Sequence, residues 1–119
     1  MAASQVALKT NYIQMKEITP QELKDLIDSN ADIQIIDVRE VSEFEEGNIN
    51  GELIPLGTVP NNVAKFSKDK QVIVHCRSGK RSANAITFLE QNHGYTNLYN
   101  LKGGILAWKN DIDDSLDVH

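Results

Sequence analysis

The 119-residue sequence is poor in the residues that build disulfide frameworks, metal sites and membrane spans. It contains one cysteine and three scattered histidines, which excludes an internal disulfide framework and predicts no metal site. A free thiol is typical of a reducing compartment, so we expect a cytoplasmic protein. No apolar run is long enough to cross a membrane and no signal-peptide core begins the chain, so we expect no membrane partner.

Positive charge is also scarce, because twelve Lys and Arg face seventeen Asp and Glu, for a net charge of −5. This balance argues against nonspecific binding to nucleic acid. The chain is long enough for one domain with a real core and too short for two. With 40% apolar and 24% charged residues, its composition is ordinary for a globular protein.

The segment Gln71 to Ser82, Gln-Val-Ile-Val-His-Cys-Arg-Ser-Gly-Lys-Arg-Ser, predicts a strand, a tight loop and a helix. The β-branched run 72–74 is typical of a strand buried on both faces of a parallel sheet, and we expect this strand to end at Cys76. Apolar residues then recur at helical spacing, and Ser82 is placed to cap that helix. Alternation along the strand turns His75 away from the cysteine, which indicates a packing or hydrogen-bonding residue.

The position of Cys76 favours a reactive thiolate over a structural core cysteine. Backbone N–H groups and the dipole of a helix N-terminus favour an anion at the end of a parallel strand. Gly79 allows the backbone to turn inward as an anion-binding nest. Arg77, Lys80 and Arg81 add positive charge to the same loop. Each of these features lowers the pKa of a thiol and raises its thiolate fraction.

The loop Cys-Arg-Ser-Gly-Lys-Arg-Ser at 76–82 resembles the active-site loop of the rhodanese (thiosulfate sulfurtransferase) family in its single-domain form. Ile-Asp-Val-Arg-Glu at 36–40, with the stretch that continues to residue 51, resembles the family's first signature block. Leu-Lys-Gly-Gly-Ile-Leu-Ala-Trp at 101–108 resembles its C-terminal block. The resemblance runs from about Ile18 to Trp108 and implies a single rhodanese-like α/β domain.

The chain in order supports this α/β architecture. We interpret residues 1–14 as an N-terminal extension and residues 15–119 as the domain, whose first helix begins with the capping box Thr-Pro-Gln-Glu at 19–22. Strands alternating with helices predict a doubly wound parallel sheet of about five strands with helices on both faces. Gly103 and Gly104 predict a sharp turn into a helix that carries Trp108 in the core.

Asp37 and Arg39 follow the strand 33–36 and should lie at the carboxyl edge of the sheet. Two such residues at a strand end are typically structural, and the resemblance implies the same bracing role. The acidic turn 43–47 predicts a short helix that ends at glycine, with its charges in solvent. Here the chain departs from the family, because it has Gly-Asn-Ile at 47–49 and Gly-Glu at 51–52 in place of Gly-His-Ile and Gly-Ala, and the connection 51–56 is one residue shorter.

Three functions from different classes fit the cysteine loop. In a sulfurtransferase, the Cys76 thiolate would take the outer sulfur of thiosulfate or a similar donor as a persulfide and pass it to cyanide or a thiol, with no cofactor. Residues 77–82 would bind substrate: their N–H groups would hold the persulfide, and the donor's anionic end would bind the cationic side chains. These substrate-binding residues are Arg77, Ser78, Gly79, Lys80, Arg81 and Ser82.

A cysteine phosphatase or arsenate reductase is the second hypothesis. Those families typically place five residues between the cysteine and an oxyanion-binding arginine, whereas four separate Cys76 from Arg81. The third is a module that binds a protein partner without catalysis, or relays sulfur to it. Loss of the cysteine would be typical of a non-catalytic module, so the intact loop favours catalysis, and sulfur relay to a protein acceptor stays open.

Overall fold

Five parallel strands in the order β2-β6-β5-β3-β4 form the centre of the computed structural model, which describes residues 15–119. Residues 1–14, predicted to be an extension, lie outside the described part. The strands are β2 (Glu17–Ile18), β3 (Ile33–Asp37), β4 (Glu52–Leu53), β5 (Gln71–His75) and β6 (Leu98–Leu101). The helices are α1 (Pro20–Asp28), α2 (Val41–Glu46), α3 (Lys80–His93) and α4 (Gly104–Asp111), with two 3-10 segments, η3 (Leu56–Asn61) and η4 (Val63–Lys65).

The middle of the central strand β5, residues 72–74, is apolar because both faces of the sheet are covered. Val72 and Val74 pack on one face with helix α3 and the 3-10 segments, whereas Ile73 packs on the other face. The register places Ile73 beside Ile35 of β3 and Tyr99 of β6. The predicted strand and its double burial are therefore confirmed, although the strand ends at His75, one residue before the predicted end at Cys76.

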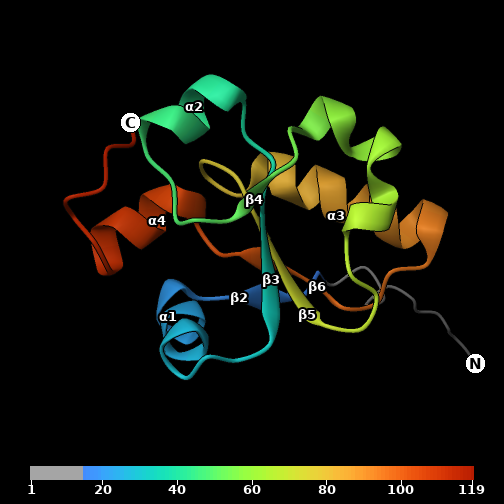
Figure 1. Ribbon diagram of the computed structural model, residues 1–119, viewed down its shortest axis with the longest axis horizontal. Helices are drawn as coiled ribbons and strands as arrows, with labels where there is room; N and C mark the ends of the chain where they lie inside the picture. Colours follow the sequence, from blue (N-terminus) through green and yellow to red (C-terminus); the bar gives the residue numbers. More distant parts are fainter. Residues whose placement is uncertain (1–14) are drawn as a thin grey trace, which may run out of the picture.

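Helices cover both faces of the sheet (Figure 1). Helix α3 packs on one face through Ala85, Ile86 and Leu89. Helices α1 and α4 pack on the other face through Leu23 and Trp108, which lie in one core cluster. These two layers confirm the predicted α/β architecture and the core position of the tryptophan.

The two main helix starts differ in how well the sequence predicted them. At α1 the capping box is confirmed: Thr19 Oγ1 accepts the Glu22 N–H at 3.1 Å, and Glu22 Oε1 accepts the Thr19 N–H at 2.9 Å. At α3 the prediction that Ser82 caps the helix was wrong. The helix begins at Lys80, and its N-terminal cap is Gly79, which has φ +112°. Glycine adopts this left-handed conformation without a Cβ penalty. Ser82 consequently lies within the first turn of the helix.

Candidate active site

The carboxyl ends of the parallel strands gather at one edge of the sheet, where the β5–α3 loop, the β3–α2 segment and the β6–α4 turn meet (Figure 1). Cys76 follows β5 directly and is 1% exposed. Strand direction alone places it at this edge, the usual position of binding sites in open α/β sheets.

Hydrogen-bond donors of the loop converge on the cysteine sulfur. The N–H of Gly79 donates to Cys76 Sγ at 3.1 Å and the N–H of Ser82 at 3.4 Å. The hydroxyl of Ser82 lies 3.4 Å from the same sulfur. The loop therefore forms a nest that can stabilise a negative charge on sulfur.

The pKa of Cys76 reflects two opposing effects. Burial alone raises the pKa of the thiol, but hydrogen bonds from the Ser82 hydroxyl and from the N–H groups of Ser82, Gly79 and Ser78 outweigh it and lower the pKa below its ordinary value. The largest contributions that lower it are thus hydrogen bonds, not the charges of the cationic side chains that the sequence emphasised. These hydrogen bonds therefore raise the thiolate fraction of Cys76 above that of an ordinary cysteine.

Asn100 on β6 is a site residue that the sequence analysis missed. It is 5% exposed, its Oδ1 accepts the Ser82 hydroxyl at 2.6 Å, and its Nδ2 donates to the Gly79 carbonyl oxygen at 3.0 Å. It therefore fixes the two residues whose N–H groups point at the sulfur. One feature of the sequence could have identified Asn100: it is a polar residue within the otherwise apolar short strand Leu-Tyr-Asn-Leu.

The start of α4 packs directly against the cysteine loop. The N–H of Ile105 donates to the Cys76 carbonyl oxygen at 2.9 Å, and the N–H of Leu106 donates to the Arg77 carbonyl oxygen at 3.1 Å. Gly104 has φ +66°, and a Cβ added there would lie 2.3 Å from the Arg77 carbonyl oxygen. The predicted sharp turn is confirmed, and its glycine permits this close contact.

The three loop cations have different surroundings. Arg81 forms a bidentate ion pair with Glu43 of α2, at 2.8 and 3.0 Å. The Arg77 Nε donates to the carbonyl oxygen of His119. Lys80 is exposed and forms no ion pair within residues 15–119. The prediction that all charges of the acidic turn face solvent is wrong for Glu43, whose pKa the hydrogen bonds from Arg81 lower to about 2.

The sequence profile of the rhodanese-like domain matches residues 19–111, most of the chain. The chain belongs to the rhodanese-like domain family. A relative from Allochromatium vinosum named sulfurtransferase is 35% identical over 95 residues, which cover 79% of this chain and 88% of the relative.

Solved structures of rhodanese-like proteins show the same fold. A rhodanese-like domain protein from Staphylococcus aureus is 36% identical, with a TM-score of 0.74 over 88% of this chain and 99% of that one. SSP1007 from Staphylococcus saprophyticus is 35% identical, with a TM-score of 0.73 over 86% and 98%. The resemblance inferred from the loop and signature blocks is therefore confirmed.

A buried ion pair joins the first signature block of this rhodanese-like domain to the end of α2. Arg39 donates to both carboxylate oxygens of Asp37 at 2.8 to 3.1 Å, and both side chains are at most 2% exposed. Arg39 also donates to the Gly47 carbonyl oxygen at 2.8 Å. Asn48 stands where the family usually has histidine, and its Nδ2 donates to the Phe44 carbonyl oxygen at 2.9 Å. The amide thus supplies a local hydrogen bond at this position.

His75 lies under the cysteine loop and is completely buried. Its Nε2 is 3.6 Å from Asp37 Oδ2 and has no hydrogen-bond partner among the described residues, while its Nδ1 lies 3.5 Å from the Cys76 carbonyl oxygen. Burial lowers the pKa of the imidazole, so the ring is neutral at neutral pH. The ring contacts backbone and carboxylate rather than the cysteine sulfur.

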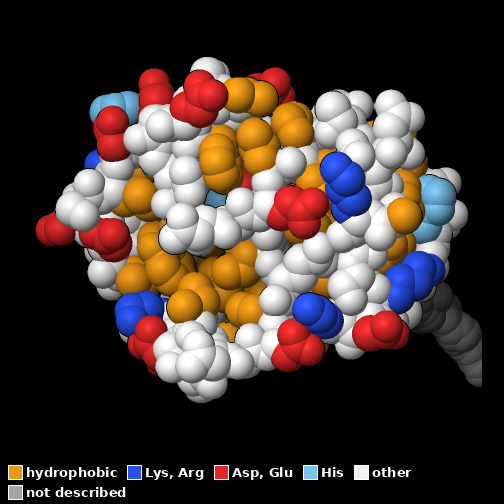
Figure 2. Space-filling model, viewed as in Figure 1, with side chains coloured by type: hydrophobic (Ala, Val, Ile, Leu, Met, Phe, Trp, Pro, Cys, Tyr) orange, Lys and Arg blue, Asp and Glu red, His pale blue; other side chains and the backbone are white. Residues whose placement is uncertain are grey.

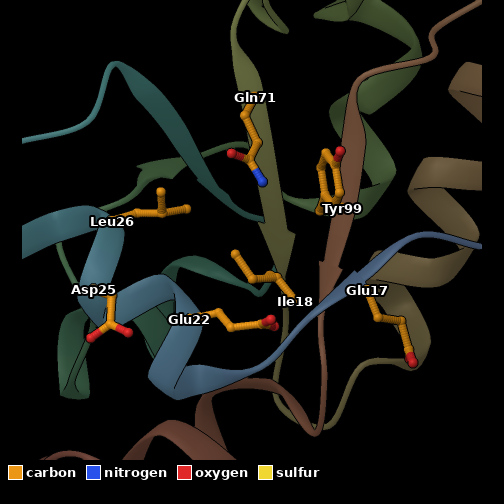
Figure 3. Close-up of a pocket in the computed structure, with 7 residues that line it drawn as sticks. All are labelled: Glu17, Ile18, Glu22, Asp25, Leu26, Gln71 and Tyr99. Carbon is orange, nitrogen blue, oxygen red and sulfur yellow. The ribbon is translucent and has the colours of Figure 1, made fainter.

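A separate cavity of about 350 Å³ lies between α1 and the strands β2, β5 and β6 (Figure 3). Its lining lacks the cysteine loop and contains three carboxylates, which disfavour an anionic ligand. The lining residues are Glu17, Ile18, Glu22, Asp25, Leu26, Gln71 and Tyr99. Within residues 15–119, no group of three His, Cys, Asp or Glu side chains is arranged to hold a metal ion, and no helix is long and apolar enough to cross a membrane.

Proposed function

We propose that this rhodanese-like domain, residues 15–119, is a sulfurtransferase in which Cys76 carries the transferred sulfur as a persulfide. The observation that carries the proposal is the convergence of the Gly79 and Ser82 N–H groups on the buried sulfur. This arrangement stabilises a thiolate and, after transfer, a persulfide anion. The relative named sulfurtransferase supports the same chemistry.

With thiosulfate as donor, the reaction takes two steps. The Cys76 thiolate attacks the outer sulfur, the Sγ–S bond forms, and the S–S bond of thiosulfate breaks with its electron pair leaving on sulfite. A thiophilic acceptor, either cyanide or a thiolate on a small molecule or a protein, then attacks the outer sulfur of the persulfide. The Sγ–S bond breaks and the thiolate is restored, so neither step needs a cofactor.

The residues around the cysteine divide this work. The N–H groups of Gly79 and Ser82 hold the charged sulfur, and the remaining backbone of 77–82 shapes the nest. Asp37 and Arg39 position the loop indirectly, since they fix the neighbouring strand end and the end of α2.

The phosphatase hypothesis fits this loop poorly. Four residues separate Cys76 from Arg81, and the arginine points to Glu43 instead of standing free for a phosphoryl group. The donors at 3.1 and 3.4 Å bind the cysteine sulfur itself, as the binding of a charged sulfur requires. Hydrolysis of small aryl phosphates should therefore be negligible beside turnover of a sulfur donor.

Intact mass measurement tests the proposal directly. After incubation with excess thiosulfate or cysteine persulfide and removal of the donor, the protein should carry one additional sulfur atom, and added cyanide should remove it as thiocyanate. The Cys76→Ser variant should fold and carry none, because an alcohol is barely ionised at neutral pH. Sulfur loading of the folded serine variant, or its absence from the native protein with both donors, would contradict the mechanism.

A further inference from the structure

The ion pair between Glu43 and Arg81 joins helix α2 to the cysteine loop. Both side chains are about two-thirds buried, with 29% and 31% exposed. The hydrogen bonds that Arg81 donates to Glu43 raise the pKa of the guanidinium, and the negative charge of Cys76 raises it further. Arg81 thus belongs to the cysteine loop while its guanidinium is bound to a carboxylate of another helix.

This pairing opposes the binding of a dianionic donor. The carboxylate of Glu43 occupies the two guanidinium donors that would otherwise bind an oxyanion in bidentate fashion. A dianionic donor that displaced the Glu43 carboxylate from Arg81 would lie next to that unpaired negative charge. Protonation cannot relieve this repulsion near neutral pH, because the pKa of Glu43 is about 2.

The start of helix α2, which carries Glu43, is partly apolar. Val41 on the first turn of α2 is 51% exposed. Figure 2 shows hydrophobic side chains together at the top of the view, over the end of α2 that follows β3. Thiosulfate has no carbon to contact such a surface, whereas an organic persulfide has a carbon group and at most one charge on its sulfane end.

Building on the sulfur transfer proposed above, we propose that Glu43 makes this site selective for organic persulfides, R–S–SH, over thiosulfate. The Cys76 thiolate attacks the outer sulfur, the Sγ–S bond forms, and the S–S bond of the donor breaks. Its electron pair leaves on R–S⁻, and the proton stays on the new persulfide until the loop N–H groups favour its loss to water. Glu43 is the residue that sets donor specificity.

The test compares Glu43→Gln with Glu46→Gln, a matched change of one charge on the same helix. Glutamine keeps an oxygen that can accept the Glu40 N–H, which Glu43 accepts at 3.0 Å, so the start of α2 is retained. With thiosulfate, kcat/KM of Glu43→Gln should rise about tenfold, because a neutral glutamine binds the Arg81 guanidinium less tightly and leaves it free to bind the dianion. With cysteine persulfide it should change less than about threefold, and Glu46→Gln should change either value less than about twofold.

A second comparison isolates the role of the arginine. In an Arg81→Ala background, the gain of Glu43→Gln with thiosulfate should fall to less than about threefold, because no guanidinium is left to release. The proposed selectivity is overturned if the ratio of kcat/KM for thiosulfate to kcat/KM for cysteine persulfide is not higher in Glu43→Gln than in the native protein. That result would leave the proposed sulfur transfer itself intact. If intact mass shows that neither donor loads Cys76 in the native protein, the proposed function itself fails.

Discussion

Replacing Gly104 by alanine tests whether the β6–α4 turn sets the position of the cysteine loop. The new Cβ would lie 2.3 Å from the Arg77 carbonyl oxygen and 2.7 Å from the Ser78 nitrogen. Ordinary contact requires one backbone to retreat by about 1 Å, which strains the hydrogen bond from Ile105 to the Cys76 carbonyl oxygen. The left-handed backbone costs alanine about 1–2 kcal/mol and overpacking about 1–3 kcal/mol, so we expect a loss of about 2–5 kcal/mol in unfolding free energy.

Gly94→Ala is the matched control for the backbone term. Gly94 has φ +69°, close to the +66° of Gly104, but nothing lies within 4 Å of its added Cβ. Gly94→Ala should therefore lose about 1–2 kcal/mol of unfolding free energy, measured by urea unfolding. The rate of cysteine alkylation by iodoacetamide should stay unchanged in this control and fall about tenfold or more in Gly104→Ala, because the loop donors move away from the sulfur. Equal stability losses with equal alkylation rates would refute the reasoning.

Four further outcomes are expected. Ser82→Ala removes the hydroxyl that helps to lower the cysteine pKa, so iodoacetamide alkylation at pH 7 should slow about tenfold, and an unchanged rate would contradict this role. Arg39→Met leaves the buried carboxylate of Asp37 unpaired and should cost about 3–5 kcal/mol in urea unfolding, whereas a loss below about 1 kcal/mol would show the pair to be dispensable. Since Glu43 has its pKa lowered from 4.5 to about 2, the stability difference between the native protein and its glutamine variant should be constant above about pH 5 and shrink as pH falls toward 2; a constant difference down to pH 2 would disprove the ion pair. Removal of residues 1–14 should change Tm by less than about 4 °C, and a larger fall would place that segment on the core.

The sequence alone determined the elements that depend on local chemistry. The β-branched run 72–74 defined the central strand, and the capping box at Thr19 defined the start of α1. A cysteine directly after a parallel strand and before a glycine predicted both the edge of the sheet and the anion nest. Such features are encoded within a few consecutive residues, so they can be read without knowledge of packing.

Tertiary structure alone decided which distant residues complete the site. Asn100, Gly104 and Glu43 reach the cysteine loop from three other segments, and no spacing in the sequence relates them to Cys76. Parallel pairing brings the carboxyl ends of the strands to one edge, but packing between the helices decides which polar groups meet there. For the same reason the charges of Arg81 and Glu43 resembled a free cation and a solvated acid in sequence, and only their contact across the edge neutralises both.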